Sequence, residues 1–192
     1  MPENVHVCPV WVGYLLASPI RRLFHSPASI LDDHLRPGMT ALDLGCAMGY
    51  FSIPMAQRVG PGGRVICLDV QERMLAALRK RATKARVLST IEPRRTAGAG
   101  LGVADLAGSV DFALAFAVMH ELPDQARALL ELAAALAPSG RLLIAEPRGH
   151  VSAAAFEATL GLARAAGLEV VDHPRHARSW SALLTRTSTV RA

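Results

Sequence analysis

An acidic residue and two glycines lie close together early in the chain, and their spacing suits a polar cofactor. Asp43 is followed by Gly45 and Gly49. Glycines allow positive φ angles and let the backbone pass close to a ligand. Residues 51–59 then show a helical pattern, and the free N–H groups at a helix start favour a polar or anionic ligand atom. The sequence predicts a strand–turn–helix cofactor site, the alternative being an ordinary corner with incidental glycines.

A second acid, Asp69, strengthens this prediction. It ends the apolar run 64–68, about 20 residues after the turn, where a carboxylate can accept hydrogen bonds from both hydroxyls of a ribose. The turn lacks the G-x-G-x-x-G pattern of dinucleotide sites. We therefore expect a ribose-containing cofactor, and the missing pattern argues against a nicotinamide dinucleotide.

Four titratable residues follow two later apolar runs. His120 and Glu121 come after the run 110–119, and Glu146 and His150 come after the run 141–145. Ligands of parallel sheets bind at the carboxyl ends of the strands, so these side chains are candidates for catalysis. His120 is the best candidate for a general base because imidazole titrates near neutrality; the alternative is a residue that bonds a loop at a helix start. Glu121 and Glu146 are candidates either to bind a substrate or to cap structure.

The elements that position these residues alternate between apolar runs and amphipathic segments. Such alternation predicts an α/β fold in which helices cover both faces of a parallel sheet. The final two strands are expected to form an antiparallel hairpin at the edge, and Pro93 argues that the third strand is also an edge. Pro54 is expected to loosen one bond of the first helix after the turn. The predicted strands are 40–44, 64–69, 91–95, 110–119, 141–145, 168–171 and 180–185, and the predicted helices are 26–35, 51–59, 71–85, 124–136 and 152–166.

Composition favours one folded domain and argues against nucleic acid, a metal ion or a membrane as its partner. The chain has 192 residues, of which 51% are apolar, and its net charge of +5 is spread over short clusters that do not form a nucleic-acid patch. Cys8, Cys46 and Cys67 lack metal-ligand spacing, so no metal is expected, and their odd number suggests a reducing, cytoplasmic location. The apolar run 10–20 is too short to cross a bilayer, and no secretory signal is visible.

The motifs together resemble those of class I S-adenosylmethionine-dependent methyltransferases. Their first motif is acid-x-Gly-x-Gly-x-Gly, and this chain has Ala47 at the middle glycine. Asp69, the segment 116–123 and Pro138-Ser139-Gly140 extend the likeness. The Cys-Pro-Val-Trp sequence at 8–11 and the His-Glu at 120–121 also resemble a group of small prokaryotic methyltransferases of unassigned acceptor. If position 47 needs positive φ, alanine there costs roughly 1 kcal/mol.

The resemblance implies a Rossmann-like, doubly wound and mostly parallel sheet of seven strands with an antiparallel last strand. It also implies an N-terminal helical segment, 1–38, that folds over the site of a domain spanning 39–192. S-adenosylmethionine would be the cofactor and a small molecule the methyl acceptor, with His150 as a candidate to bind it. Trp11 and Tyr14 are also candidates to line the acceptor pocket, the alternative being that they anchor the N-terminal segment on the core. Because no acid follows the third strand, the backbone of residues 97–98 would serve the adenine. The implied cofactor-binding residues are Asp43, Gly45, Cys46, Ala47 and Gly49 at the methionine, Asp69 at the ribose, Val70, Ala97 and Gly98 at the adenine, and Phe116 and Ala117 at the sulfonium.

Methyl transfer to a small molecule is the function that these features favour. Three alternatives stay open: an RNA methyltransferase, an NAD(P)-dependent oxidoreductase on a similar fold, and a protein that binds S-adenosylmethionine without catalysis. The chain lacks the Asn/Asp-Pro-Pro-aromatic motif after the fourth strand, which argues against the first of these, and nucleic acid is not an expected partner. The sequence leaves the oligomeric state open, a homodimer included.

Overall fold

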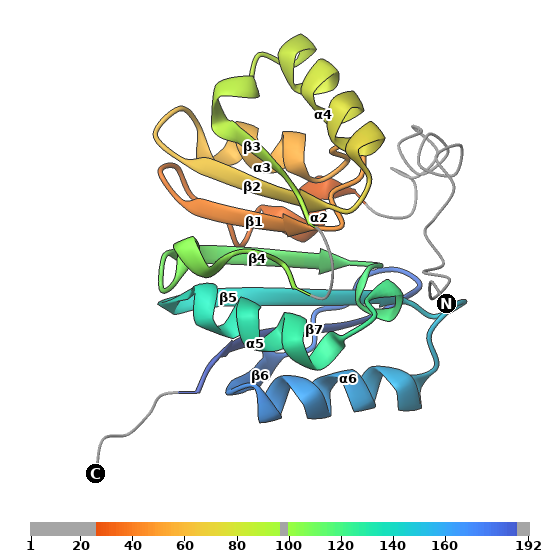
Figure 1. Cartoon of the computed structure of the whole chain (residues 1–192). Coiled ribbons are helices and arrows are strands. Elements are labelled where there is room, and N and C mark those ends of the chain that lie inside the picture. Colours follow the sequence, from red (N-terminus) through yellow and green to blue (C-terminus); the bar gives the residue numbers. More distant parts are fainter. Residues whose placement is uncertain (1–25, 97–99, 188–192) are drawn as a thin grey trace.

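The computed structural model describes residues 26–96 and 100–187 and shows one seven-stranded sheet with helices on both faces (Figure 1). The strand order is β3-β2-β1-β4-β5-β7-β6. The parallel strands all end on the right-hand side of the sheet in Figure 1, so the residues that follow them meet at one edge. The strands are β1 (Thr40–Leu44), β2 (Arg64–Asp69), β3 (Ile91–Arg95), β4 (Val110–Phe116), β5 (Leu136–Pro147), β6 (Leu168–Asp172) and β7 (Ser179–Arg186).

Two buried clusters form because successive strand residues point to opposite faces of the sheet. On one face Leu142 and Ile144 of β5 pack with the helices α5 (Gln125–Ala135) and α6 (Ala153–Ala165). On the other face Leu143 and Ala145 belong to the cluster that contains α2 (Pro27–Leu31), α3 (Ser52–Val59) and α4 (Glu72–Lys84). Short 3-10 turns are formed by Leu88–Thr90, Ala104–Leu106 and Met119–Glu121.

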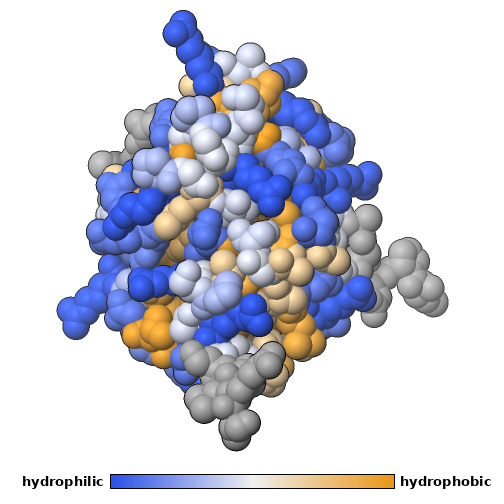
Figure 2. All heavy atoms as spheres, turned by 90° about the vertical axis from the view of Figure 1, so that its left-hand side faces the viewer, coloured by the Kyte–Doolittle hydropathy of each residue, from blue (hydrophilic) through white to orange (hydrophobic). Residues whose placement is uncertain are grey.

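The predicted fold class is confirmed, including the antiparallel pairing of the last strands. β7 runs antiparallel to both β5 and β6, and β6 forms the edge of the sheet. β3, which contains Pro93, forms the other edge, as predicted. The edge opposite to the carboxyl ends is mostly hydrophilic, with small apolar areas scattered among charged side chains (Figure 2).

Several predicted boundaries were wrong. β4 ends at Phe116 rather than at residue 119, because Ala117 has a φ of 56° and Met119 opens a 3-10 turn. α2 ends at Leu31, well short of residue 35. Pro54 lies in the first turn of α3, where backbone N–H groups have no partner within the helix, so it removes no helical bond. β5 begins at Leu136, which pairs with Val110 across an irregular register, so Pro138-Ser139-Gly140 lies within the strand.

Candidate functional site

The turn after β1 is built from alternating residues in the left-handed region. Gly45, Ala47 and Gly49 have φ angles of 70°, 47° and 80°. The N–H groups of Gly45 and Cys46 both donate to the carbonyl oxygen of Leu68, at 2.9 and 3.0 Å, which ties the turn to β2. Position 47 therefore requires the positive φ that a glycine would adopt without strain.

Two glycines of this turn also allow close packing. A Cβ on Gly45 would lie 2.5 Å from Cγ2 of Val118, in the segment that follows β4. A Cβ on Gly49 would lie 2.3 Å from Cδ1 of Leu78 in α4. The first contact is the more restrictive, because a β-branched side chain has little freedom to move.

Asp69 contacts the turn directly. Its Oδ2 accepts a hydrogen bond from the N–H of Ala47 at 2.9 Å, and its Oδ1 accepts one from the N–H of Gln71 at 2.8 Å. Burial raises the pKa of Asp69, and these backbone hydrogen bonds oppose the rise. A carboxylate has about four acceptor positions, so Asp69 can accept a further hydrogen bond from a donor such as a ribose hydroxyl.

Asp43 is buried, with 2% of its surface exposed, and it holds the start of α3. Its Oδ2 accepts a hydrogen bond of 2.5 Å from the hydroxyl of Ser52. This contact links the end of β1 to the start of α3.

Cys46 and Cys67 are buried free thiols. The hydrogen bond with Cys67 and burial both raise the pKa of the Cys46 thiol well above its ordinary value. Cys46 is therefore a neutral thiol at neutral pH, and the group that it offers to a ligand is its backbone.

The other predicted cofactor residues divide into three groups. Val70 follows β2 and is 47% exposed, so its side chain is accessible to a flat apolar ligand. Phe116 ends β4 and packs on Phe51 with ring centroids 4.8 Å apart. Ala117 follows with a φ of 56° and donates its N–H to Ala145 at 2.7 Å. The predicted cofactor residues Ala97 and Gly98 fall outside the described residues, as do Trp11 and Tyr14, which were predicted to bind the acceptor.

A buried carboxylate connects the carboxyl ends of β4 and β5. Glu146 is 1% exposed, and its Oε1 accepts hydrogen bonds from the N–H groups of Val118 at 3.2 Å and Met119 at 2.8 Å. Its Oε2 bonds Nδ1 of His120. Burial raises the pKa of Glu146, while His120 and the two backbone donors lower it. We call His120 and Glu146 the dyad.

In the dyad, the Nε2 atom of His120 takes no part in the bond to Glu146. The side chain of His120 is 29% exposed, and Nε2 lies on the opposite side of the ring from the bond to Glu146. The ring of His150 lies 6.2 Å from that of His120, centroid to centroid. Burial raises the pKa of Glu121, and the neighbouring His120 opposes the rise. The predicted catalytic residues and His150 are therefore gathered at one edge of the sheet.

The sequence offered His120 and Glu146 as candidates for catalysis but did not predict the bond between them. His120 follows the end of β4 and Glu146 lies at the end of β5, and these are adjacent parallel strands in which Phe116 pairs with Ala145. Knowing that these two strands are neighbours would have predicted that His120 and Glu146 meet.

Among the described residues, no group of three or more histidine, cysteine or acidic side chains is placed to bind a metal. In the same part of the chain, no helix is long and apolar enough to cross a membrane.

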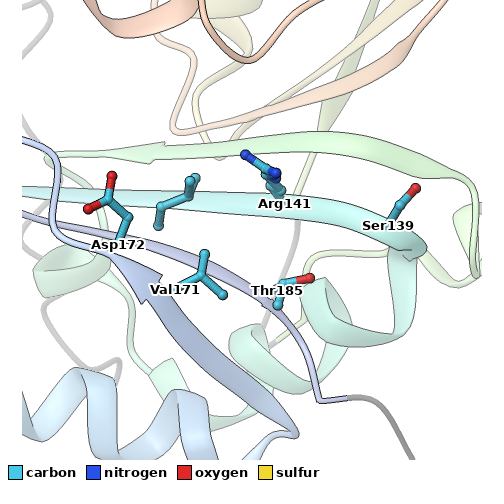
Figure 3. A pocket seen from close by; sticks show the side chains of 6 residues that line it. Ser139, Arg141, Val171, Asp172 and Thr185 are labelled. Atoms are coloured by element: carbon cyan, nitrogen blue, oxygen red, sulfur yellow. The ribbon is translucent and has the colours of Figure 1, made fainter.

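A cavity of about 550 Å³ lies away from this edge, over β5, β6 and β7 (Figure 3). It includes Arg141 at the start of the regular part of β5, five residues before Glu146, or about 17 Å along the strand. Its side chains are spread along the strands rather than directed at one point, and it is separate from the site.

The model of a methyltransferase-domain family matches residues 35–185. This chain belongs to that methyltransferase-domain family. A relative named nocamycin O-methyltransferase, from Saccharothrix syringae, is 38% identical over 58% of this chain. The chain spans 39% of that relative's length, and well under two thirds of the other curated relatives it matches.

Solved structures confirm the Rossmann-like methyltransferase fold. An S-adenosylmethionine-dependent methyltransferase from Aquifex aeolicus has a TM-score of 0.82 and 23% identity, covering 94% of this chain and all of its own. The [4+2]-cyclase SpnF has a TM-score of 0.65 and 19% identity, over 77% of this chain and 57% of its own. The prediction of a methyltransferase domain with S-adenosylmethionine as its cofactor is confirmed at the level of the family.

The residues present fit that cofactor. Asp69 offers carboxylate lone pairs beside the turn, as a ribose diol requires. Val70 offers an exposed apolar surface at the end of β2, as an adenine ring requires. Gly45, Ala47 and Gly49 have small side chains or none, so a ligand can approach the backbone of the turn closely.

Proposed function

We propose that this protein transfers a methyl group from S-adenosylmethionine to a hydroxyl oxygen of a small molecule, with His120 as the general base. The observation that carries this proposal is the dyad, in which a buried carboxylate holds an imidazole at the cofactor edge of the sheet. The relative named nocamycin O-methyltransferase supports an oxygen acceptor.

The dyad suits the removal of a proton from a hydroxyl group. If Glu146 accepts the proton of Nδ1–H, the lone pair of the imidazole lies on Nε2, where a base is needed. The backbone donors of Val118 and Met119 fix the carboxylate in turn, so the ring is held in one orientation. Glu146 is thus a positioning residue, and His120 is the group that would touch the acceptor.

When bound, S-adenosylmethionine supplies an electrophilic methyl group, so the protein has mainly to position the acceptor and exclude water. In the overall reaction Nε2 of His120 would take the hydroxyl proton while the hydroxyl oxygen accepts the methyl group, and S-adenosylhomocysteine would be the leaving group. Asp69 would hold the ribose, and the turn from Gly45 to Gly49 would hold the methionine part. Glu121 and His150, beside His120, would contact the acceptor.

The test has two stages, cofactor binding and turnover. Calorimetry with S-adenosylhomocysteine measures the cofactor site, and transfer of a labelled methyl group to a panel of hydroxyl compounds measures turnover. We expect His120→Gln to lower the rate by roughly 10²–10⁴-fold, the usual contribution of a general base, with S-adenosylhomocysteine affinity unchanged. A matched control is His34→Gln, which removes a histidine stacked on Phe112 outside the site.

Other outcomes of these two assays would support one of the alternative functions. Binding of NAD with none of S-adenosylhomocysteine would support an oxidoreductase, and methyl transfer only to RNA would support the RNA alternative. Tight S-adenosylhomocysteine binding with no transfer to any acceptor would support a non-catalytic binding protein or a different reaction. The cyclase among the structural neighbours illustrates that the fold alone does not fix the chemistry.

Two further predictions, on location and on domain division, stay proposals. We propose a cytoplasmic location, because an odd number of cysteines without a disulfide framework suggests a reducing compartment. We keep the division into an N-terminal segment, 1–38, and a domain, 39–192; limited proteolysis followed by mass spectrometry would test the boundary.

A further inference from the structure

A second cavity, of about 800 Å³, lies next to α6 and to the loop that follows β5. It is formed by the loop after β5, the first turn of α6, and the connection between β6 and β7 with the start of β7. We call it the cationic pocket, and its lining residues are Arg148, Phe156, Glu157, His173, Pro174, Arg175, His176, Ala177, Arg178, Ser179, Trp180 and Ser181.

The charges that line this pocket are mostly positive. Arg148, Arg175 and Arg178 contribute three guanidinium groups, against a single carboxylate, Glu157. Oε2 of Glu157 lies 3.8 Å from Nη2 of Arg164, a residue outside the lining, so the acid is partly neutralised from elsewhere.

Arg148 is held in a fixed position. Its Nε donates to the carbonyl oxygen of Ser179 at 3.1 Å, and its guanidinium lies 4.2 Å from the ring centroid of Trp180. Trp180 is fixed in turn, because its Nε1 donates to Val151 at 3.0 Å. No carboxylate in the described part of the chain forms an ion pair with Arg148 or Arg175, so both guanidinium groups keep donors for a ligand.

Ser181 gives an independent reason to expect a ligand. It lines the pocket, 7% of its surface is exposed, and its Oγ forms no hydrogen bond with any described residue. A buried hydroxyl without a partner is destabilising, and native proteins rarely leave one. An acceptor atom in the pocket would satisfy it.

We propose that the cationic pocket binds the oxyanion group, a carboxylate or a phosphate, of a small molecule. Guanidinium groups bind such groups through paired, charge-assisted hydrogen bonds, and Ser181 adds a neutral donor. The proposal concerns a site outside the cofactor turn, and it does not depend on the methyl transfer proposed above.

A small ligand fits the charge distribution better than a nucleic acid does. Nucleic-acid sites need basic residues along an extended face. Elsewhere on this chain several arginines are paired with acids, as in Arg58 with Asp32, Arg79 with Glu72, and Arg94 with Asp105. In the described part of the chain, Arg148 and Arg175 have no such acidic partner, and both line this concave surface.

The experiment titrates the full-length protein, saturated with S-adenosylhomocysteine, with inorganic phosphate and separately with acetate. Ionic strength is held constant with chloride, and binding is followed by the NMR signal of the Trp180 indole N–H, assigned with Trp180→Phe. We expect saturable shifts with at least one of the two anions. Arg175→Gln and Arg148→Gln should each weaken binding roughly fivefold to tenfold, as expected for the loss of a charge-assisted hydrogen bond at an open site. Ser181→Ala should weaken it by a smaller factor.

Arg73→Gln is the matched control, since it removes one positive charge from an exposed position on α4. The proposal is overturned if neither anion saturates the signal, or if the pocket variants bind as Arg73→Gln does. It is also overturned if a short single-stranded RNA displaces phosphate and its affinity falls steeply with salt, which would identify a nucleic-acid site. Because the readout is anion binding, its failure is distinguishable from failure of methyl transfer.

Discussion

Replacing Ala47 by glycine should stabilise the protein, although it removes a methyl group. Ala47 has a φ of 47°, and a residue with a Cβ in the left-handed region carries a cost of about 1–2 kcal/mol. Glycine removes that cost but gives the unfolded chain more freedom, which offsets about 0.4–1 kcal/mol. The net expectation is an increase of about 0.5–1 kcal/mol in the free energy of unfolding.

Urea denaturation with the midpoint and slope measured together checks this value, because an unchanged slope shows that only stability has changed. For a chain of this size the gain corresponds to an increase of about 1–4 °C in Tm. The N–H of residue 47 still donates to Asp69 in the variant, so S-adenosylhomocysteine affinity should not fall.

Ala76→Gly is the control, because Ala76 is an exposed residue within α4. There the same substitution should destabilise by about 1 kcal/mol, since glycine weakens a helix interior. Opposite signs for the two variants are the expected result. If Ala47→Gly destabilises as Ala76→Gly does, the strain assigned to the turn is absent and the reasoning fails.

Three further predictions concern the same edge of the sheet. Gly45→Ala should destabilise by about 2–4 kcal/mol in urea denaturation, because its Cβ would meet Val118 at 2.5 Å in a strained backbone; a loss below 1 kcal/mol would contradict the contact. Asp69→Ala should weaken S-adenosylhomocysteine binding by about 1.5–3 kcal/mol in calorimetry, and unchanged affinity would remove its assigned role. Burial raises the pKa of Glu146 above its ordinary 4.5, so between these two values the native state binds more protons than the unfolded state and stability falls as pH rises. Glu146→Gln should flatten that decline in unfolding measurements from pH 4.5 upward, and an identical pH dependence would refute the assignment.

Apolar runs in the sequence predicted the strands and the acidic residues at their ends. Asp43 and Asp69 each end an apolar run, and both runs are strands that carry the acids to one edge. The end of β4 was predicted too late because residues 117–119 remain apolar, while the backbone turns away at Ala117. Hydrophobicity reports burial, and Val118 and Met119 are buried in a turn as fully as they would be in a strand.

The contacts that were missed join residues far apart in sequence. Glu146 and His120 are 26 residues apart and meet because β4 and β5 are adjacent in the sheet. The cationic pocket combines Arg148 with Arg175 and Ser181, which requires β7 to lie antiparallel between β5 and β6. A sequence indicates such an arrangement only when the order of the strands is known.

The contact between Gly45 and Val118 connects the two halves of the proposed site. Gly45 belongs to the cofactor turn, and Val118 donates its N–H to Glu146, which in turn orients His120. A shift in the turn would therefore move the carboxylate that positions the imidazole. Because the absence of a Cβ at position 45 permits this approach, we infer that the glycine is required there for the placement of the base as well as for the cofactor. Gly45→Ala should accordingly lower the rate of methyl transfer even when S-adenosylhomocysteine saturates the protein in a binding assay, and a variant with a normal rate at saturating cofactor would show that the two halves are independent.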